Sequence, residues 1–146
     1  MAREDFRFVH RMRVRWVEVD AQGVVFNGNY LTYFDVAMTE YFRVLDFPYQ
    51  DLADKHGADL VVVRSVTDYH SPARFDDEID VYVRTGRIGR SSFQLLFEIY
   101  RDDEHLISGE LVYVNVDIAN RSSKPLPHAI RSAIEAYEQG KGSGAE

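Results

Sequence analysis

One short segment, residues 15–35, holds the residues with the clearest capacity for chemistry. Asp20 follows a strand-like stretch, Gly23 allows a tight turn, and apolar residues at helical spacing begin at Tyr30. The first turn of a helix has unpaired backbone N–H groups and a partial positive charge, which suit a polarised carbonyl oxygen. A carboxylate beside it can act as a nucleophile or as a general base on water. The pattern favours acyl transfer to water; the alternative is an aspartate that only caps the helix or forms a turn.

Other catalytic patterns are missing from the sequence. Because the chain has no Cys, disulfides, thiolate catalysis and Cys-ligated zinc are excluded. The five histidines show no HxxxH or HExxH spacing, so a metal site would have to be assembled from distant elements. The absence of a GxGxxG, P-loop or GxSxG motif argues against a dinucleotide site, a nucleoside triphosphate site and serine–histidine catalysis. We therefore expect no metal and no cofactor.

Length, charge and the ends of the chain narrow the class of protein. The chain has 146 residues, and we expect one domain over residues 1–139 followed by a flexible, glycine-rich tail over 140–146. The net charge of -7 argues against nucleic-acid binding, because binding to a phosphate backbone needs a basic surface. The first residues are charged and no apolar run approaches about 18 residues, which predicts neither a secretory signal nor a membrane span. We therefore expect a cytoplasmic protein.

Hydrophobic periodicity predicts the elements that must position this segment. Short alternations over residues 6–19 predict a half-buried strand. Over residues 30–45 the apolar positions cover nearly all sides of a helix, which is typical of a buried helix. Asn27 or Asn29 is the expected N-cap of this helix, and Pro48 is its expected stop.

After this helix the sequence is strand-like up to residue 118. The extended stretches are residues 60–69, 79–84, 93–100 and 106–116. Because short turns join them, we expect an antiparallel meander. A short helix over residues 50–57 and a final helix over 129–137 are also indicated. A curled sheet of strands about 33 Å long can bury a helix about 25 Å long on nearly all sides, so the predicted fold is α+β, one antiparallel sheet around one central helix.

The segment 20–35 resembles the signature of hotdog-fold acyl-CoA thioesterases of the 4-hydroxybenzoyl-CoA thioesterase type. The shared run is Asp20-x-x-Gly23-x-Val25-x-Asn27-x-x-Tyr30-x-x-Tyr33-Phe34-Asp35. Residues 13–16, 72–79 and 124–127 are similar to the family's first strand, its turn into the third strand and its closing loop. The resemblance covers roughly residues 6–130. It implies a hotdog fold and hydrolysis of an acyl-CoA thioester to the free acid and coenzyme A, with no cofactor.

The resemblance also implies roles for single residues. Asp20 matches the catalytic carboxylate, the backbone N–H of Asn27 matches the donor to the thioester carbonyl, and Gly23 lets the chain turn closely past the substrate. Many relatives have Tyr-His where this chain has Phe26-Asn27, which leaves the backbone donor but not a side-chain role at position 27. Many also have Arg where Met38 stands, so we do not expect the helix ion pair that such an Arg forms.

Further residues are candidates for substrate binding. Phe26 is a candidate substrate contact. Tyr30 and Phe34 are expected to shape an acyl pocket, and core packing is the alternative for both. Arg90 and Ser91 match a turn where relatives place contacts to coenzyme A phosphates, and Lys124 offers a second basic position. The alternative for these last residues is the ordinary solvated surface. Local cations matter here because the protein as a whole is acidic and the ligand is an anion.

Other acidic residues near Asp20 have open alternatives. Glu18 lies two residues before it, on the same face of the predicted strand, and either orients Asp20 or is an exposed strand glutamate. Asp35 and Glu40 fall on the predicted helix, where we expect structural hydrogen-bonded roles rather than catalysis.

The resemblance implies a homodimer or tetramer in which sheets join edge to edge and each site is built from two chains. The aromatic content of 13% fits such extra burial. Besides a second copy, the expected partner is the acyl-CoA substrate. The alternative function is a non-catalytic hotdog protein that binds an acyl ligand or acts as a scaffold; such a binder does not need a carboxylate beside the helix end. A dehydratase or hydratase is disfavoured, because no His lies between His10 and His56.

Overall fold

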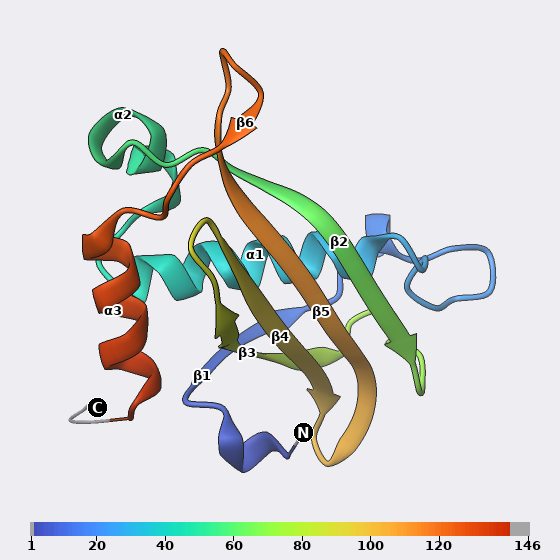
Figure 1. Ribbon diagram of the computed structural model, residues 1–146. Coiled ribbons are helices and arrows are strands. Elements are labelled where there is room, and N and C mark those ends of the chain that lie inside the picture. The colour runs from blue at the N-terminus through green and yellow to red at the C-terminus, as the bar shows by residue number, and fades with distance from the viewer. Residues whose placement is uncertain (1, 141–146) are drawn as a thin grey trace.

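A six-stranded antiparallel sheet curls around the long helix α1 (Asn29–Val44) in the computed structural model, which describes residues 2–140 (Figure 1). The strands are β1 (Phe8–Arg13), β2 (Leu60–Tyr69), β3 (Glu78–Ile88), β4 (Ser92–Arg101), β5 (Glu104–Asp117) and β6 (Ser122–Ser123). They lie in the order β1-β3-β4-β5-β2, and β6 pairs with β5. In β3 and β4 buried residues alternate with more exposed ones, as the period of a pleated strand requires. The predicted sheet around one helix is confirmed.

Shorter helical segments complete the described chain. They are α2 (Leu52–His56), α3 (His128–Glu138) and the 3-10 segments η1 (Arg3–Asp5), η2 (Trp16–Glu18) and η3 (Tyr49–Asp51). Helix α3 packs beside the C-terminal half of α1, where the rings of Tyr41 and Tyr137 lie 5.8 Å apart (Figure 1). The short helix expected near residues 50–57 and the final helix are confirmed. The expected tail over 140–146 lies, apart from Gly140, outside the described residues.

The strand connections agree with the predicted meander only for β3, β4 and β5. Strand β2 pairs with β5, from Leu60 opposite Asn115 to Tyr69 opposite Ile107, and not with β3. The outer edge of β3 is taken by β1, with Phe8 opposite Val83. Because β3 has a partner on each side, the chain must cross the end of the sheet after β2. Residues 70–77 make this crossing, and we call them the 70–77 connection.

The first predicted strand is shorter than its sequence pattern indicates. Strand β1 ends at Arg13, and residues 16–18 form the 3-10 segment η2 instead of extended chain. The Glu18 carboxylate accepts the backbone N–H of Arg15 at 2.7 Å and its guanidinium at 2.8 Å, which closes a tight turn. This local side-chain bonding outweighs the alternation over residues 14–19, which predicted a strand.

The core lies between α1 and the concave face of the sheet. The buried residues of α1 are Tyr30, Tyr33, Phe34, Ala37, Met38, Tyr41 and Phe42. The Phe34 ring stacks on Phe97 of β4 with ring centroids 4.5 Å apart. Gly109 on β5 makes room for that ring, because a Cβ at this position would overlap it. The missing side chain therefore sets how closely α1 approaches the sheet.

Helix α1 differs from its prediction in three respects. It is not buried on all sides, since the sheet covers one face and Leu31, Val36 and Val44 are exposed. Gly28 is its N-cap, and no side chain caps it. It ends at Val44, before the expected stop at Pro48, because Asp46 adopts a left-handed φ of 70° and the N–H of residue 47 bonds back to the helix.

Candidate active site

The chain between η2 and α1 folds into a narrow loop that carries Asp20. Val19 and Val25 form an antiparallel bridge, and we call residues 19–25 the Asp20 loop. Gly23 adopts a φ of 80° at its tip, a conformation that glycine reaches without strain. The Asp20 Oδ1 atom accepts the N–H of Gln22 at 2.8 Å. The Oδ2 atom accepts no hydrogen bond within residues 2–140, so one carboxylate oxygen is held in place while the other is available to a ligand.

Buried Glu18 ties the Asp20 loop to α1. Its carboxylate accepts the hydroxyl of Tyr33 at 2.8 Å, and its backbone carbonyl accepts the Asn29 side-chain amide at 2.9 Å. Burial alone would raise the pKa of Glu18, but the hydrogen bonds from the Arg15 amide, Tyr33 and the Arg15 guanidinium outweigh it, so the pKa is lowered. Both sequence alternatives for Glu18 are therefore wrong: the side chain is not exposed, and its bonds go to Arg15 and Tyr33 rather than to Asp20.

The N-terminal end of α1 lies beside this loop. The backbone N–H of Asn27 has no acceptor within the described part of the chain, as expected for a group just before the first helical turn. The carbonyl of Asn27 accepts the N–H of Tyr30 at 3.4 Å and the hydroxyl of Tyr69 at 3.5 Å. The carbonyl oxygen of Asn27 thus has partners within the chain, whereas the N–H of Asn27 is available to donate to a ligand.

A pocket of about 300 Å³ joins these groups. Its lining residues are Asp20, Gln22, Val24, Val25, Asn27, Tyr30, Tyr69, His70, Ser71 and Pro72. One wall is the Asp20 loop with the start of α1, and the other is the end of β2 with the 70–77 connection. The walls are bonded to each other, because Val25 N–H donates to the Ala73 carbonyl at 2.9 Å and Ala73 N–H donates to the Tyr30 hydroxyl at 3.1 Å.

The predicted site residues lie at two separate places in the chain, one at the pocket and one at the turn between β3 and β4. Asp20, Asn27 and Tyr30 line the pocket, whereas Phe26 is 53% exposed next to it. Gly23 shapes the Asp20 loop from outside the lining. Arg90 lies at the opposite end of the sheet.

The second group occupies the far end of β3. Arg90 and Ser91 form the turn between β3 and β4, and Lys124 bonds through its backbone N–H to the Asn115 carbonyl nearby. The pocket lies near the start of β3, since one guanidinium, that of Arg101, bonds both to the pocket-lining Pro72 and to Asp77 just before that strand. At about 3.3 Å per residue, β3 runs for about 35 Å along its own path, so these groups and the pocket lie at opposite ends of a long strand.

The sequence did not indicate the second wall of the pocket. Tyr69 is the last residue of β2, and His70 and Ser71 begin the 70–77 connection. No sequence pattern assigned these three residues to the site. These residues reach the site because β2 ends next to the start of α1. That position follows from the crossing of the chain from β2 to β3, which the sequence does not reveal. The ring of His70 lies 4.4 Å from that of His105, although the two are distant in sequence. Residues 2–140 contain no group of three or more His, Cys, Asp or Glu arranged to hold a metal ion.

The antiparallel sheet curled around α1 is the hotdog architecture. Its candidate pocket places Asp20 and Asn27 together at the start of the helix. Residues 14–134 match the model of the Thioesterase-like superfamily, and the chain belongs to that family. The chain is a thioester hydrolase. No helix in the described residues has both the length and the apolar character that a membrane crossing needs.

Individual relatives agree with this membership over most of the chain. The acyl-CoA thioesterase YbgC of Haemophilus influenzae is 27% identical over 130 residues, covering 89% of this chain and 96% of the relative. The 1,4-dihydroxy-2-naphthoyl-CoA hydrolase of Nostoc punctiforme is 23% identical over 139 residues, covering 95% and 93%. The structure is similar to that of a thioesterase from Thermus thermophilus complexed with coenzyme A and zinc, with a TM-score of 0.81, 32% identity and coverage of 93% and 97%.

Proposed function

We propose that the chain hydrolyses an acyl-CoA thioester to a carboxylic acid and coenzyme A in the Asp20 pocket. The observation that carries this proposal is the pairing, in one pocket, of the free Asp20 Oδ2 with Asn27 at the start of α1. Relatives named as acyl-CoA thioesterases support the substrate class.

The reaction uses two groups of this chain. The thioester carbonyl oxygen accepts the backbone N–H of Asn27, and the positive end of α1 stabilises the charge that develops on this oxygen. The Asp20 carboxylate either attacks the carbonyl carbon or takes a proton from an attacking water. In the first route an acyl-aspartyl anhydride forms, coenzyme A leaves as the thiolate and takes a proton from solvent, and water then opens the anhydride. In the second route water adds directly and the protonated Asp20 returns its proton to the thiolate.

The residues predicted to bind the coenzyme A phosphates lie at the far end of β3 from the pocket of their own chain, so the proposed site needs a second chain. We infer a homodimer formed through the outer edge of β2, where Val61, Val62 and Val63 are exposed. The other outer edge, β1, carries the charged Arg11 and Arg13, which discourages pairing there.

Antiparallel pairing of two β2 strands would bring the Leu60 end of one chain beside the Tyr69 end of its partner. Leu60 is opposite Asn115, to which Lys124 is bonded, so the basic end of one chain would approach the pocket of the other. In this arrangement Arg90, Ser91 and Lys124 would serve the pocket of the partner chain, where we propose that they contact the coenzyme A phosphates, and not the pocket of their own chain.

A thiol-release assay with a panel of acyl-CoA substrates tests the proposed function. The panel contains short aliphatic, long aliphatic and hydroxyaryl thioesters, because relatives are named for both general acyl-CoA and aromatic substrates. We expect release of free coenzyme A from at least one class. Saturable binding of a thioester without any release would contradict hydrolysis and favour the non-catalytic acyl-binding alternative.

A further inference from the structure

Hydrogen bonds hold the 70–77 connection from two sides. On the inside, Ala73 bonds to Tyr30 and to Val25 of the Asp20 loop. On the outside, it contacts Arg101, the last residue of β4, whose side chain is only 19% exposed. The connection supplies the pocket wall opposite Asp20, so whatever fixes its outer side also fixes the width of the pocket.

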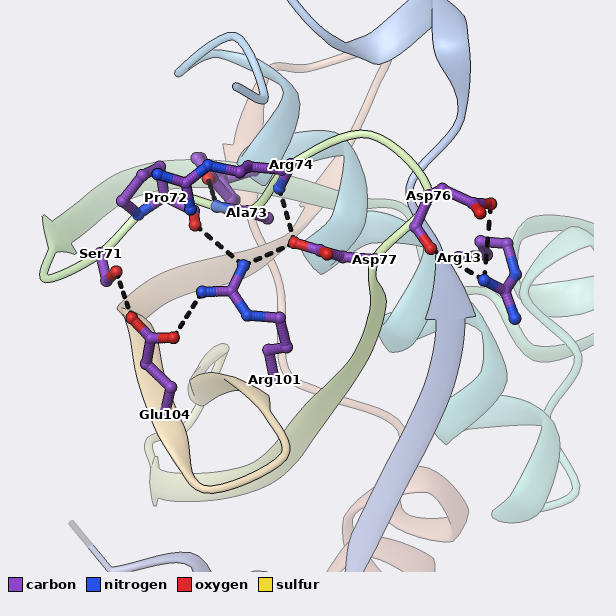
Figure 2. Close-up of polar contacts among 10 residues, drawn as sticks. Arg13, Ser71, Pro72, Ala73, Arg74, Asp76, Asp77, Arg101 and Glu104 are labelled. Carbon is purple, nitrogen blue, oxygen red and sulfur yellow. Dashed lines mark hydrogen bonds and ion pairs between the residues drawn. The ribbon is translucent and has the colours of Figure 1, made fainter. Parts of the chain in front are cut away.

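Arg101 joins both ends of the connection through one guanidinium group (Figure 2). Its Nη1 donates to the Pro72 carbonyl at 3.2 Å and to Asp77 Oδ2 at 2.5 Å. Its Nη2 donates to Glu104 Oε1 at 2.5 Å, and the other oxygen of Glu104 accepts the Ser71 hydroxyl at 2.5 Å. Two of the residues held in this way, Ser71 and Pro72, line the pocket.

The charges of this cluster suit a rigid clamp. The hydrogen bonds from Ser71 and Arg101 lower the pKa of Glu104, so it remains a carboxylate at neutral pH. A guanidinium is planar and presents its donors in a fixed fork, so it can hold three acceptors in one geometry. A lysine at position 101 would retain the charge but, as a single ammonium on a flexible stem, could not bond to the Pro72 carbonyl, Asp77 and Glu104 in the same arrangement.

We propose that Arg101 is a positioning residue for thioester hydrolysis. It sets the place of the Ser71-Pro72 wall across the pocket from Asp20, and it acts through the Pro72 carbonyl and the adjoining Ala73. This inference rests on the proposed function. Productive geometry is sensitive to small displacements: a misplacement of about 1 Å caused by a residue far from the reacting atoms can cost about 10²-fold in rate.

The test compares Arg101→Gln and Arg101→Lys with the control Arg13→Gln. Arg13 also holds the connection, since it donates to the Asp76 carbonyl at 2.8 Å, but it is 53% exposed and does not contact the pocket-lining residues. For Arg101→Gln we expect kcat to fall by about 10²-fold while KM changes by less than about threefold. Arg101→Lys should recover part of this loss, and Arg13→Gln should retain the wild-type kcat.

Amide hydrogen exchange over residues 70–77 gives a readout independent of turnover. We expect faster exchange there in Arg101→Gln, with the thermal midpoint and the exchange of the β3–β4 core kept. Unchanged exchange in this connection would overturn the inference, and so would a lower thermal midpoint with unchanged kcat, which would mark Arg101 as a stability residue only.

A second variant, Glu104→Gln, tests the same inference if Arg101→Gln does not fold. Glu104→Gln removes the charge between Arg101 and Ser71 but leaves the Asp77 contact, so a smaller fall in kcat with the same faster exchange is expected. Wild-type kcat and exchange in this variant would overturn the inference. If the wild type itself releases no coenzyme A, the proposed function fails, and the exchange measurement alone then decides whether Arg101 holds the wall.

Discussion

Tyr33 of α1 donates a 2.8 Å hydrogen bond to Glu18 of η2, so one buried carboxylate joins the central helix to the segment just before the Asp20 loop. The same carboxylate is paired with Arg15, and its backbone carbonyl accepts the N–H of Phe26 and the side chain of Asn29. Glu18 thus links the residues before and after Asp20. Glu18 therefore holds the chain just before the Asp20 loop against α1, while its carboxylate bonds to Arg15 and Tyr33 and not to Asp20.

Removing one of the groups that donate a hydrogen bond to the Glu18 carboxylate should destabilise the fold. In Tyr33→Phe a buried carboxylate loses a hydrogen bond, and we expect the free energy of unfolding to fall by about 1–3 kcal/mol. Urea denaturation of the variant and the wild type measures the difference. Tyr113→Phe is the matched control, because this tyrosine is also buried but its hydroxyl has no hydrogen-bond partner within the described residues. A loss as large as that of Tyr33→Phe would contradict the special role of the Glu18 contact.

The lowered pKa of Glu18 predicts how its contribution depends on pH. The pKa of this carboxyl is lower in the folded chain than in the unfolded chain, where it is about 4.3. Its contribution to stability is therefore complete above about pH 4.3 and is lost as pH falls through the folded-state pKa. We expect the stability difference between wild type and Glu18→Gln to be constant from neutral pH down to about pH 5 and to shrink below about pH 4. A difference that grows on acidification would contradict the sign.

Asp20→Asn should keep the fold and remove most of the activity. The substitution is nearly isosteric but deletes the base or nucleophile, and a general base alone typically contributes about 10²–10⁴-fold. The values of kcat/KM and of the thermal midpoint for the variant check this. A variant with the wild-type midpoint and more than about a tenth of the wild-type kcat/KM would rule out the proposed role.

A lysine in the exposed edge of β2 should break the proposed dimer. Val62→Lys places a charge in the edge that we infer to pair with its copy, whereas Val9→Lys places the same charge on the opposite edge strand, β1. Light scattering at micromolar concentration should report a dimer or tetramer for the wild type and Val9→Lys, and a monomer for Val62→Lys. A fully active wild-type monomer would contradict the two-chain site.

Arg90→Ala should weaken substrate binding without changing the chemistry. A phosphate contact far from the thioester is the same in the ground state and the transition state, so KM should rise by the equivalent of about 1–3 kcal/mol while kcat stays nearly constant. The control substrate is the same acyl group on N-acetylcysteamine, which has no phosphate. An equal rise of KM with both substrates would indicate a structural role, and no change with either would place Arg90 on the ordinary surface.

The sequence predicted the fold class and the main helices and strands correctly, but it did not predict which strands pair with each other. The apolar stripe from Tyr30 to Phe42 and the alternation in β3 and β4 depend on local periodicity, and both gave elements of the right type. The pairing of β2 with β5 has no local signal, because it depends on β1 having taken the free edge of β3. The turn at η2 was missed because the bond between Glu18 and Arg15 overrides an alternating pattern.

The site was predictable to a similar extent. The glycine turn and the start of the helix are encoded within one segment, so Asp20 and Asn27 could be found together. Arg101 and Pro72 are 29 residues apart and in no shared motif, and only the folded sheet brings them together. The residues of one pocket wall can be found within a single sequence segment, whereas the wall that faces it depends on tertiary structure.

The pairing of β2 with β5 also has a consequence for the newly made chain. Leu60 and Tyr69 leave the ribosome well before Asn115 and Ile107, their partners in the sheet. At about 5–20 residues per second, β2 waits roughly two to ten seconds for its partner strand to be synthesised. During that time its valines and the apolar face of α1 have no cover within the chain, which favours aggregation between nascent chains. Synthesis rate and chaperone supply should therefore affect the yield of this protein more than its final stability would suggest.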